Sequence, residues 1–404
     1  MRFVQLSDVC DLQNGFAFKS TDYVEKSNTC NIRMSNIRPG GSFNEFHNER
    51  YLPDSYAKEY KDYLLNDGDL IIAMTDMATE TKILGLPTLV NNTSGRSFLL
   101  NQRVGKLCKF SKDIYVPYLR HILTSQDVID YYKSKGAGGL QINISKKDIL
   151  SVKFPLPAIP TQKKIVAKLD AIFAEIDTAT AAAEANANNA EALFQSYLTK
   201  VFERAGEGWK LSTLGEYYDV RDGTHDSPKF QDLGYPLVTS KNLKNGNINF
   251  EKIQYISKED YLNISQRSGV KKGDVLMAMI GTIGNPVVVD TDNEFAIKNV
   301  ALFKTNNSQS PKFLSYYLSS DYVIKKMEKD AKGTTQKFVG LGYLRSFPIK
   351  VPNKSSQEKV VETLGNYENH IKILSKSYVQ KLNELLLLKQ SILQKAFSGE
   401  LVKD

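Results

Sequence analysis

The chain contains one unit twice, and this internal repeat restricts the possible fold more than any other sequence feature. Residues 116–202 align with residues 311–397 at a constant offset of 195, without a gap. Identical residues recur at matching positions, for example Leu119 and Leu314, Gln141 and Gln336, Gln162 and Gln357, and Phe202 and Phe397. A match of this length is very improbable by chance, so we expect two copies of one folding unit.

The repeat continues toward the N-terminus with small changes in length. LSDVCDLQNG at 6–15 aligns with LGEYYDVRDG at 214–223, and GDLIIAM at 68–74 aligns with GDVLMAM at 273–279. Each copy is therefore a globular head followed by a long segment that favours helix. We expect four regions: head 1 at 1–155, a central helical region at 156–205, head 2 at 206–350, and a C-terminal helical region at 351–404.

Both heads have the composition of β-rich domains. Short runs of β-branched and aromatic residues, such as PLVTSKNL and NPVVVD, are separated by Asn, Gly, Asp and Pro. The Gly-Asp pair before each apolar run of GDLIIAM and GDVLMAM predicts a turn followed by a buried strand. Helical patches are predicted at about 116–134 and 311–329.

Each head is followed by about forty residues that favour a single long helix. Residues 162–202 contain neither Pro nor Gly, and residues 357–397 contain no Pro and one Gly. Apolar residues recur at heptad spacing in both segments, and each helix would be about 60 Å long. The residues that we predict to pack between the two helices are Leu169, Ile176, Leu193, Leu364, Ile371, Leu385 and Ile392.

The middle of the first helix, Thr178–Ala192, is rich in alanine, whereas the second helix is rich in Leu and Tyr. Small residues let two helix axes approach closely, so we expect the helices to pair with each other, and to run antiparallel. The fold class would be α+β: two β-rich domains, pseudo-twofold related, separated by an antiparallel coiled coil of two long helices. The alternative is two separate surface helices that serve only as linkers. Additional leucines at 382, 385–388 and 393 widen the apolar stripe and require a further partner, most simply another protein.

Composition restricts the class of partner and the compartment only broadly. The net charge of +8 and the pI near 9 are compatible with nucleic acid, an anionic membrane or an acidic protein, or with an ordinary solvated surface. The sequence contains no uninterrupted apolar stretch of about 18 residues, so we predict no membrane span. The N-terminus does not resemble a signal peptide. The three widely spaced cysteines, Cys10, Cys30 and Cys108, predict neither a disulfide framework nor a zinc site, which fits the cytoplasm.

The sequence contains no residue constellation typical of an active site, so we predict no catalytic residue and no metal ligand. The tetrapeptide NPVV at 285–288 lacks the second proline of the motif that amino-methyltransferases carry, and no phosphate-binding loop with GK[ST] is present. Pro53-Asp54 followed by Glu59-Tyr60-Lys61 resembles the PD…ExK pattern of Mg²⁺-dependent nucleases. However, the two acidic residues are too close in sequence for paired strands, and the second copy carries Lys258 in place of Asp54.

The duplicated motifs together resemble the type I restriction-modification specificity subunits (HsdS family). The motifs are Asp11/Gly15 with Asp219/Gly223, GDLIIAM with GDVLMAM, GGLQ (138–141) with GTTQ (333–336), and PAIPTQKKIVAKLD with PNKSSQEKVVETLG. Each motif is weak alone, but their duplicated order is specific, and the resemblance covers the whole chain. The chain departs from the pattern at Gly215-Glu216-Tyr217 and in residues 178–192, which lack the short repeat of some members.

This resemblance implies a non-catalytic subunit whose heads are two target recognition domains. Each head would bind half of a bipartite, asymmetric site in double-stranded DNA. The paired helices would set the distance between the half-sites and dock two methyltransferase subunits, and an endonuclease or translocase subunit would join that complex. S-adenosylmethionine, ATP and Mg²⁺ would belong to the partners, and this chain would hold no cofactor.

Polar residues at turn-like edges of the heads are our candidates for DNA contacts, because Gln and Asn recognise adenine, Arg recognises guanine, and Lys and Arg bind phosphates. The candidates are Arg33, Arg38, Asn101, Gln102, Arg103 and Gln141 in head 1, and Lys241, Lys244, Lys298, Asn299, Gln336 and Lys337 in head 2. For each, the alternative is an ordinary solvated residue. The alternative functions are a tandem protein-binding scaffold without DNA specificity and a self-sufficient nuclease.

Overall fold

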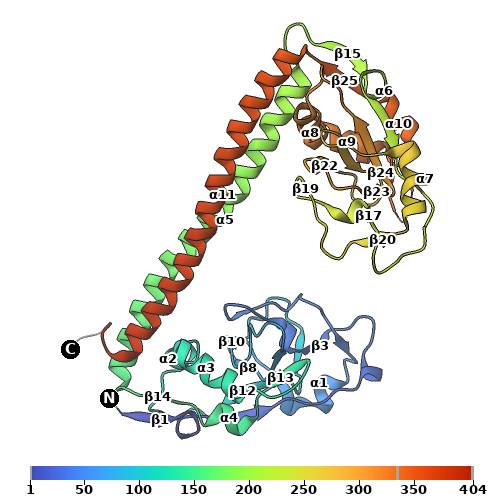
Figure 1. Cartoon of the computed structure of the whole chain (residues 1–404). Coiled ribbons are helices and arrows are strands. Elements are labelled where there is room, and N and C mark those ends of the chain that lie inside the picture. The colour runs from blue at the N-terminus through green and yellow to red at the C-terminus, as the bar shows by residue number, and fades with distance from the viewer. Residues whose placement is uncertain (1, 334–335, 402–404) are drawn as a thin grey trace. The chain divides into compact units, whose positions relative to one another are not determined.

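The computed structural model describes residues 2–333 and 336–401, which form two compact units. Unit 1 comprises residues 1–182 and 381–404, and unit 2 comprises residues 183–380. Each unit holds one head together with a part of both long helices, α5 (Ile159–Arg204) and α11 (Lys354–Ser398) (Figure 1). Among the described residues, no helix is both long and apolar enough to cross a membrane.

Head 1 is built on two four-stranded sheets. One is antiparallel, in the order β10–β8–β12–β2, and the other, β6–β3–β11–β7, contains the parallel pair β3–β11. The strands are β1 (Phe3–Gln5), β2 (Asp11–Asn14), β3 (Thr29–Ile32), β4 (Ile37–Arg38), β5 (Ser42–Phe43), β6 (Tyr51–Leu52), β7 (Leu64–Leu65), β8 (Leu70–Ala73), β9 (Thr75–Met77), β10 (Pro87–Leu89), β11 (Ser97–Leu100), β12 (Val104–Cys108), β13 (Gln141–Asn143) and β14 (Lys153–Pro155). The helices are α1 (Tyr56–Glu59), α2 (Val116–Ile122), α3 (Gln126–Lys135) and α4 (Lys146–Leu150).

Head 2 repeats this plan with a four-stranded sheet, β16–β24–β21–β22, and a three-stranded sheet, β20–β17–β23. Its parallel pair β17–β23 corresponds to β3–β11, since Val238 pairs with Ile297 as Ile32 pairs with Leu100. The strands are β15 (Lys210–Thr213), β16 (Asp219–Asp222), β17 (Tyr235–Val238), β18 (Leu243–Lys244), β19 (Asn247–Ile248), β20 (Gln254–Ile256), β21 (Val275–Ala278), β22 (Gly284–Val288), β23 (Ala296–Ile297), β24 (Val300–Lys304) and β25 (Pro348–Val351). The helices are α6 (Leu214–Tyr217), α7 (Lys258–Ser268), α8 (Pro311–Ser319), α9 (Asp321–Asp330) and α10 (Leu341–Ser346).

The local predictions from the repeat are confirmed with one refinement. The apolar runs after the Gly-Asp pairs are β8 and β21, in which every residue is buried. The predicted helical patches at about 116–134 and 311–329 are each two helices, α2–α3 and α8–α9. The break falls at Ser125 and Ser320, which adopt extended backbone angles and begin the second helix of each pair.

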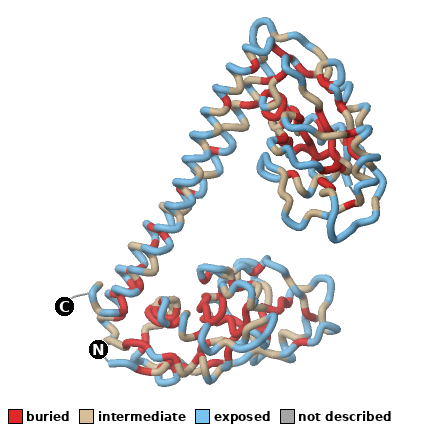
Figure 2. Tube along the Cα trace, in the orientation of Figure 1, coloured by how far each residue is buried: buried red, intermediate tan, exposed pale blue. Residues whose placement is uncertain are grey.

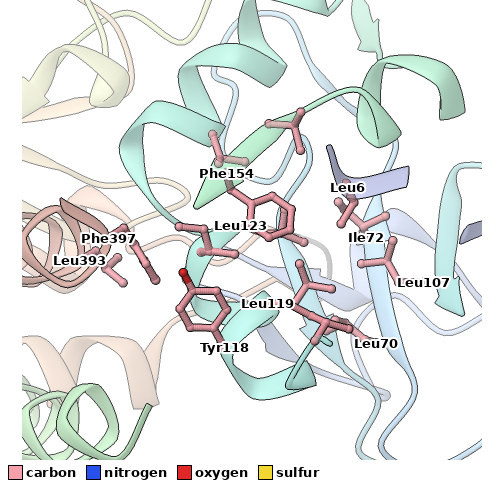
Figure 3. Close-up of a cluster of buried hydrophobic side chains, with 14 of the residues drawn as sticks. Leu6, Leu70, Ile72, Leu107, Tyr118, Leu119, Leu123, Phe154, Leu393 and Phe397 are labelled. Carbon is pink, nitrogen blue, oxygen red and sulfur yellow. The ribbon is translucent and has the colours of Figure 1, made fainter. Parts of the chain in front are cut away.

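The core of unit 1 joins the head to both long helices. Leu6, just after β1, and Ile72 of β8 face Tyr118, Leu119 and Leu123 on and after α2 (Figure 3). On the other side of α2, Phe397 of α11 lies edge-on to Tyr118, with ring centroids 5.5 Å apart. Figure 2 shows how buried residues gather inside each head, while most of the outer helix surface is exposed. The heads are thus packed on the helices of their own unit by apolar side chains.

The two long helices pair in antiparallel fashion within each unit. In unit 1, Lys389 Nζ bonds to Asp177 at 2.9 Å, and Lys168 Nζ donates to the carbonyl of Leu401 at 3.0 Å. Residues closer to the N-terminus of α5 therefore bond to residues closer to the C-terminus of the chain, so the two segments run antiparallel. In unit 2, Tyr197 contacts Tyr367 with ring centroids 4.4 Å apart, and Val201 shares a small groove with Val360 and Leu364. The predicted pairing is confirmed, and the two-linker alternative is wrong.

The residues predicted to pack between the helices differ in burial. Leu169 and Leu364 are fully buried and Ile176 and Leu385 nearly so, whereas Ile371 and Ile392 are half-buried. The prediction for Leu193 is wrong, since its side chain is 66% exposed. On the neighbouring turn of α5, Phe194 contacts Tyr316 of α8 in head 2, and Tyr197 is the residue that contacts Tyr367 of α11.

A buried glutamine at the start of each long helix ties that helix to its head. Gln162 Oε1 accepts from the Tyr115 amide at 2.8 Å, and its Nε2 donates to the carbonyls of Asp113 and Pro157, each at 2.8 Å. Gln357 repeats the arrangement with the amide of Ser310, the carbonyl of Pro352 and the hydroxyl of Tyr217. Both glutamines are completely buried. The glutamine of the duplicated Pro-Gln segment is therefore a structural link between head and helix.

Replacing Gln162 with Ala should lower the free energy of unfolding of unit 1 by about 2–3 kcal/mol, because it removes the three hydrogen bonds of a fully buried side chain. Denaturant unfolding followed by a unit 1 probe measures the change. Gln126→Ala is the matched control, because Gln126 is exposed and its Nε2 donates to Asp130 on the same helix at 2.7 Å. Equal stability of the two variants would contradict the linking role.

The junction of unit 1 also contains a histidine whose side chain is 12% exposed. His121 of α2 bonds through Nε2 to Asp170 of α5 at 2.8 Å. Burial lowers the pKa of His121, although the bond to Asp170 opposes this effect. The folded unit therefore binds a proton at this site less readily than the unfolded chain does, so stability is complete above the unfolded pKa and is lost as the pH falls below it.

We expect unit 1 to lose stability as the pH falls below about 6.5, the usual pKa of an unfolded histidine. His121→Gln should flatten this part of the profile, because the uncharged amide does not titrate. Thermal unfolding of unit 1 over this pH range measures the slope, with His47→Gln, at an exposed position of head 1, as control. A slope unchanged by His121→Gln would refute the assignment.

Candidate nucleic-acid interface

The loop after the parallel strand pair places candidate residues of both heads at equivalent positions. The Asn101 amide donates to the Ile32 carbonyl at 3.0 Å, as the Lys298 amide donates to the Val238 carbonyl at 2.9 Å. The next residue repeats the match, because the Gln102 amide donates to the Phe16 carbonyl and the Asn299 amide donates to the Thr224 carbonyl. Asn101 and Lys298, and likewise Gln102 and Asn299, are therefore structural counterparts, which the sequence alignment had not paired.

A second pair lies beyond the short helical turn that follows β3 or β17. Asn36 and Asn242 end these turns, and their side-chain amides donate to the carbonyls of Asn44 and Asn249 in the same way. Two residues after each asparagine come Arg38 on β4 and Lys244 on β18. The other candidates near this turn, Arg33 and Lys241, do not correspond, since Arg33 precedes the turn and Lys241 lies within it.

The third pair is Gln141 and Gln336. The Ile144 amide donates to the Met74 carbonyl and the Val339 amide to the Met279 carbonyl, which fixes the same register in both heads. Gln141 is half-buried on β13, and Gln336 and Lys337 are exposed. Thr334 and Thr335, the middle of the predicted GTTQ motif, lie outside the described residues. Gln141 and Gln336, which are 195 residues apart in sequence, therefore also occupy equivalent positions in the structure.

One candidate is corrected by its environment. Asn101 is only 7% exposed, and its Oδ1 accepts from the Arg103 amide at 3.2 Å. Its side chain shapes the turn and is not available to a ligand. Gln102 and Arg103, which follow it, are exposed. Head 2 has no counterpart of Arg103, since Asn299 is followed directly by the strand residue Val300.

A glycine lets the turn after β2 or β16 approach this loop closely. A Cβ atom on Gly15 would lie 2.2 Å from the carbonyl oxygen of Asn101, and one on Gly223 would lie 2.2 Å from that of Ile297. Any side chain would therefore push the two segments apart. This contact explains why the duplicated motif keeps glycine at these two positions.

The turn in head 2 carries a polar network that sequence reasoning missed. His225 Nδ1 lies 2.8 Å from Asn299 Oδ1, and its Nε2 lies 2.9 Å from Asp222 Oδ2. Arg267 of α7 pairs with the other oxygen of Asp222 at 2.9 Å. The available signal was the position of His225, two residues after the duplicated glycine.

The same turn in head 1 is covered by aromatic rings. Phe16 lies 4.6 Å from Tyr60 and 5.4 Å from Tyr63, measured between ring centroids, and Phe18 packs against Tyr56 and Tyr60. Burial raises the pKa of the Tyr60 hydroxyl, with nearby Glu59 acting in the same direction. The two heads thus share a backbone frame but present different chemistry at this turn.

The nuclease-like pattern does not form a site. Asp54 accepts from the Asn28 amide at 2.9 Å and from the Thr29 hydroxyl at 3.1 Å, while Glu59 ends the short helix α1. Neither residue lies on a strand. Across residues 2–333 and 336–401, no group of three or more His, Cys, Asp or Glu side chains could hold a metal ion.

Comparison with known proteins identifies the family. The model of the type I restriction modification DNA specificity domain matches residues 1–186 and 206–384. The chain therefore belongs to the type I restriction-modification specificity family, and it is a DNA-specificity subunit, not a catalytic one. The family resemblance and the expected fold class are confirmed.

Two curated relatives show the extent of the similarity. The specificity subunit of type I restriction enzyme MjaVIII from Methanocaldococcus jannaschii is 25% identical over 354 residues, covering 82% of this chain and 80% of the relative. The EcoBI specificity subunit from Escherichia coli is 24% identical over 432 residues, covering 98% of this chain and 85% of the relative.

Two solved structures share the fold over nearly the full length. One, from work on complex assembly and conformational transition of the type I R-M system, has a TM-score of 0.72 at 20% identity, covering 99% of this chain and 98% of the other. The HsdS subunit from Thermoanaerobacter tengcongensis has a TM-score of 0.56 at 20% identity, covering 99% and 97%.

Gly223→Ala should destabilise head 2 by about 1–3 kcal/mol, because the new methyl group overlaps the Ile297 carbonyl and forces the backbone apart. Hydrogen exchange should speed up at residues 222–225 and 297–300. Gly342→Ala is the control, since Gly342 lies in helix α10 with no atom within 4 Å of an added Cβ. Exchange that is equally slow in both variants would contradict the close approach.

Proposed function

We propose that the two heads bind the two halves of a bipartite, asymmetric site in double-stranded DNA. The observation that carries this proposal is the set of equivalent loop positions with different side chains. Arg38 corresponds to Lys244, and Gln102 corresponds to Asn299. A shared frame that presents different donors and acceptors is what two recognition domains with different targets require.

The charges at these positions suit the two parts of DNA recognition. Lys244, Lys337 and Arg103 are exposed cations that can reach phosphates, which supply most of the affinity. Gln102, Gln141, Asn299 and Gln336 are amides, which can read base edges in the major groove. A protein-binding scaffold would have no need for amides at matching positions of both heads.

We propose further that the long helices set the gap between the half-sites and dock partner subunits. Each is a single uninterrupted helix, of 46 residues for α5 and 45 for α11. Apolar side chains remain on the surface of α11, with Ile373 59%, Leu386 61% and Leu387 69% exposed. Exposed apolar side chains that gather on one element are typical of protein–protein interfaces.

The partners in this proposal are two methyltransferase subunits and an endonuclease or translocase subunit. The reactions would take place on those subunits, which would bind S-adenosylmethionine, ATP and Mg²⁺. This chain would hold no cofactor and would contribute the DNA sequence and the assembly geometry.

Methylome sequencing of cells that express this chain with its methyltransferase partner tests the proposal. We expect two short specified sequences separated by a gap of fixed length and free sequence, because two heads on continuous helices read two separate segments. Methylation without a bipartite motif, or none at all, would favour the scaffold alternative.

A head exchange provides the matched control. Replacing residues 206–350 with the corresponding head of another family member should change one half-site and leave the other as it was. A change in both half-sites would contradict independent recognition by the two heads.

A further inference from the structure

The loop that carries Asn299 in head 2 contains a histidine contact that head 1 cannot make. Asn299 Oδ1 lies 2.8 Å from Nδ1 of His225. The residue of head 1 in the position of His225 is Ala17, two residues after Gly15, and its side chain has no polar atom. The side chain of Gln102, the counterpart of Asn299, is exposed.

The imidazole of His225 is held at both ends. Its Nε2 lies 2.9 Å from Oδ2 of Asp222, whose side chain is only 10% exposed. Arg267 fixes that carboxylate through Oδ1 at 2.9 Å and also donates to the Gly223 carbonyl at 2.8 Å. The ring therefore has little freedom to turn away from Asn299.

This arrangement orients the amide of Asn299. An amide oxygen only accepts, so in the contact between His225 Nδ1 and Asn299 Oδ1 the ring nitrogen is the donor. The Asn299 carbonyl oxygen consequently points inward to His225. In the described part of the chain its Nδ2 amide has no hydrogen-bond partner, and the residue is only partly buried.

The backbone supports the same orientation. Asn299 has φ of 55°, in the left-handed region that asparagine tolerates better than most residues. Its amide donates to the Thr224 carbonyl at 3.1 Å, which ties it to the turn that carries His225. Main chain and side chain of Asn299 are thus both fixed from the same segment.

We propose that His225 is a positioning residue that makes Asn299 a hydrogen-bond donor in base recognition by head 2. An outward Nδ2 pairs with acceptors in the major groove, namely purine N7, guanine O6 or thymine O4, and it disfavours cytosine, which offers only its N4 amino group. Gln102 of head 1 lacks such a constraint and can use both amide atoms, as adenine requires. The inference rests on the proposed DNA recognition and specifies its chemistry.

Methylome sequencing of the complete complex with Asn299→Asp tests this inference. Aspartate keeps the size of asparagine and tolerates the same backbone angles, but it can only accept. One position of one half-site should therefore change from excluding cytosine to preferring cytosine or adenine, whose N4 or N6 amino group donates, by about tenfold in relative methylation.

His225→Ala should change the same position, because the freed Asn299 carbonyl can then accept, which shifts the preference toward adenine. The other half-site should stay unchanged in both variants. A variant that merely destabilised the head would instead lower methylation at all sites alike. The control is Lys272→Ala, which removes an exposed ion pair with Asp292. Lys272 lies before the first residue of β21, whereas Asn299 lies near the other end of that strand.

The outcomes separate this inference from the function on which it rests. A wild-type complex without a bipartite motif overturns the proposed function, and this inference with it. A bipartite motif that neither variant alters, or that the two variants alter at different positions, overturns the role of His225 and leaves DNA recognition by the heads standing.

Discussion

Each head is tied to its long helix by a fully buried glutamine, and the placement of the candidate surface depends on this link. Gln162 and Gln357 each bond three polar groups of the segments around the helix start. Because both glutamine side chains are fully buried, their amides depend on these partners, and a helix that pulled away would lose all three bonds. The apolar contact of Phe397 with Tyr118 adds to the same junction in unit 1. Loops far from the helix in sequence, which carry the candidate residues, are therefore held on a firmly attached frame.

The two heads show how one backbone frame can carry two different surfaces. Glycines 15 and 223 hold the same close approach, and Asn36 and Asn242 shape the same turn. Around this common backbone, head 1 places aromatic rings where head 2 places Asp222, His225 and Arg267. Duplication preserved the residues that the backbone geometry needs and left the exposed side chains free to diverge.

Much of the fold could be predicted from the sequence, because its signals are local or periodic. The constant offset of the repeat predicted two similar heads, and heptad spacing predicted two long helices. The buried strands β8 and β21 followed from apolar runs after a turn. The prediction for Leu193 failed, because this residue is exposed, whereas Phe194 contacts Tyr316 of head 2 and Tyr197 contacts Tyr367 of α11. A sequence stripe of mixed Ala, Leu and Phe does not reveal which side chain turns toward the head and which toward the other helix.

The sequence by itself determined the duplication, the helical segments and the family, since each depends on residue order along the chain. Only the tertiary structure decided which candidates are exposed and which correspond. Asn101 is buried by its turn, and Gln102 matches Asn299 because parallel strands bring their loops to the same edge. The contact of His225 with Asn299 joins residues 74 positions apart. Contacts of this kind depend on strand pairing and not on neighbours in sequence, so no local pattern could have shown them.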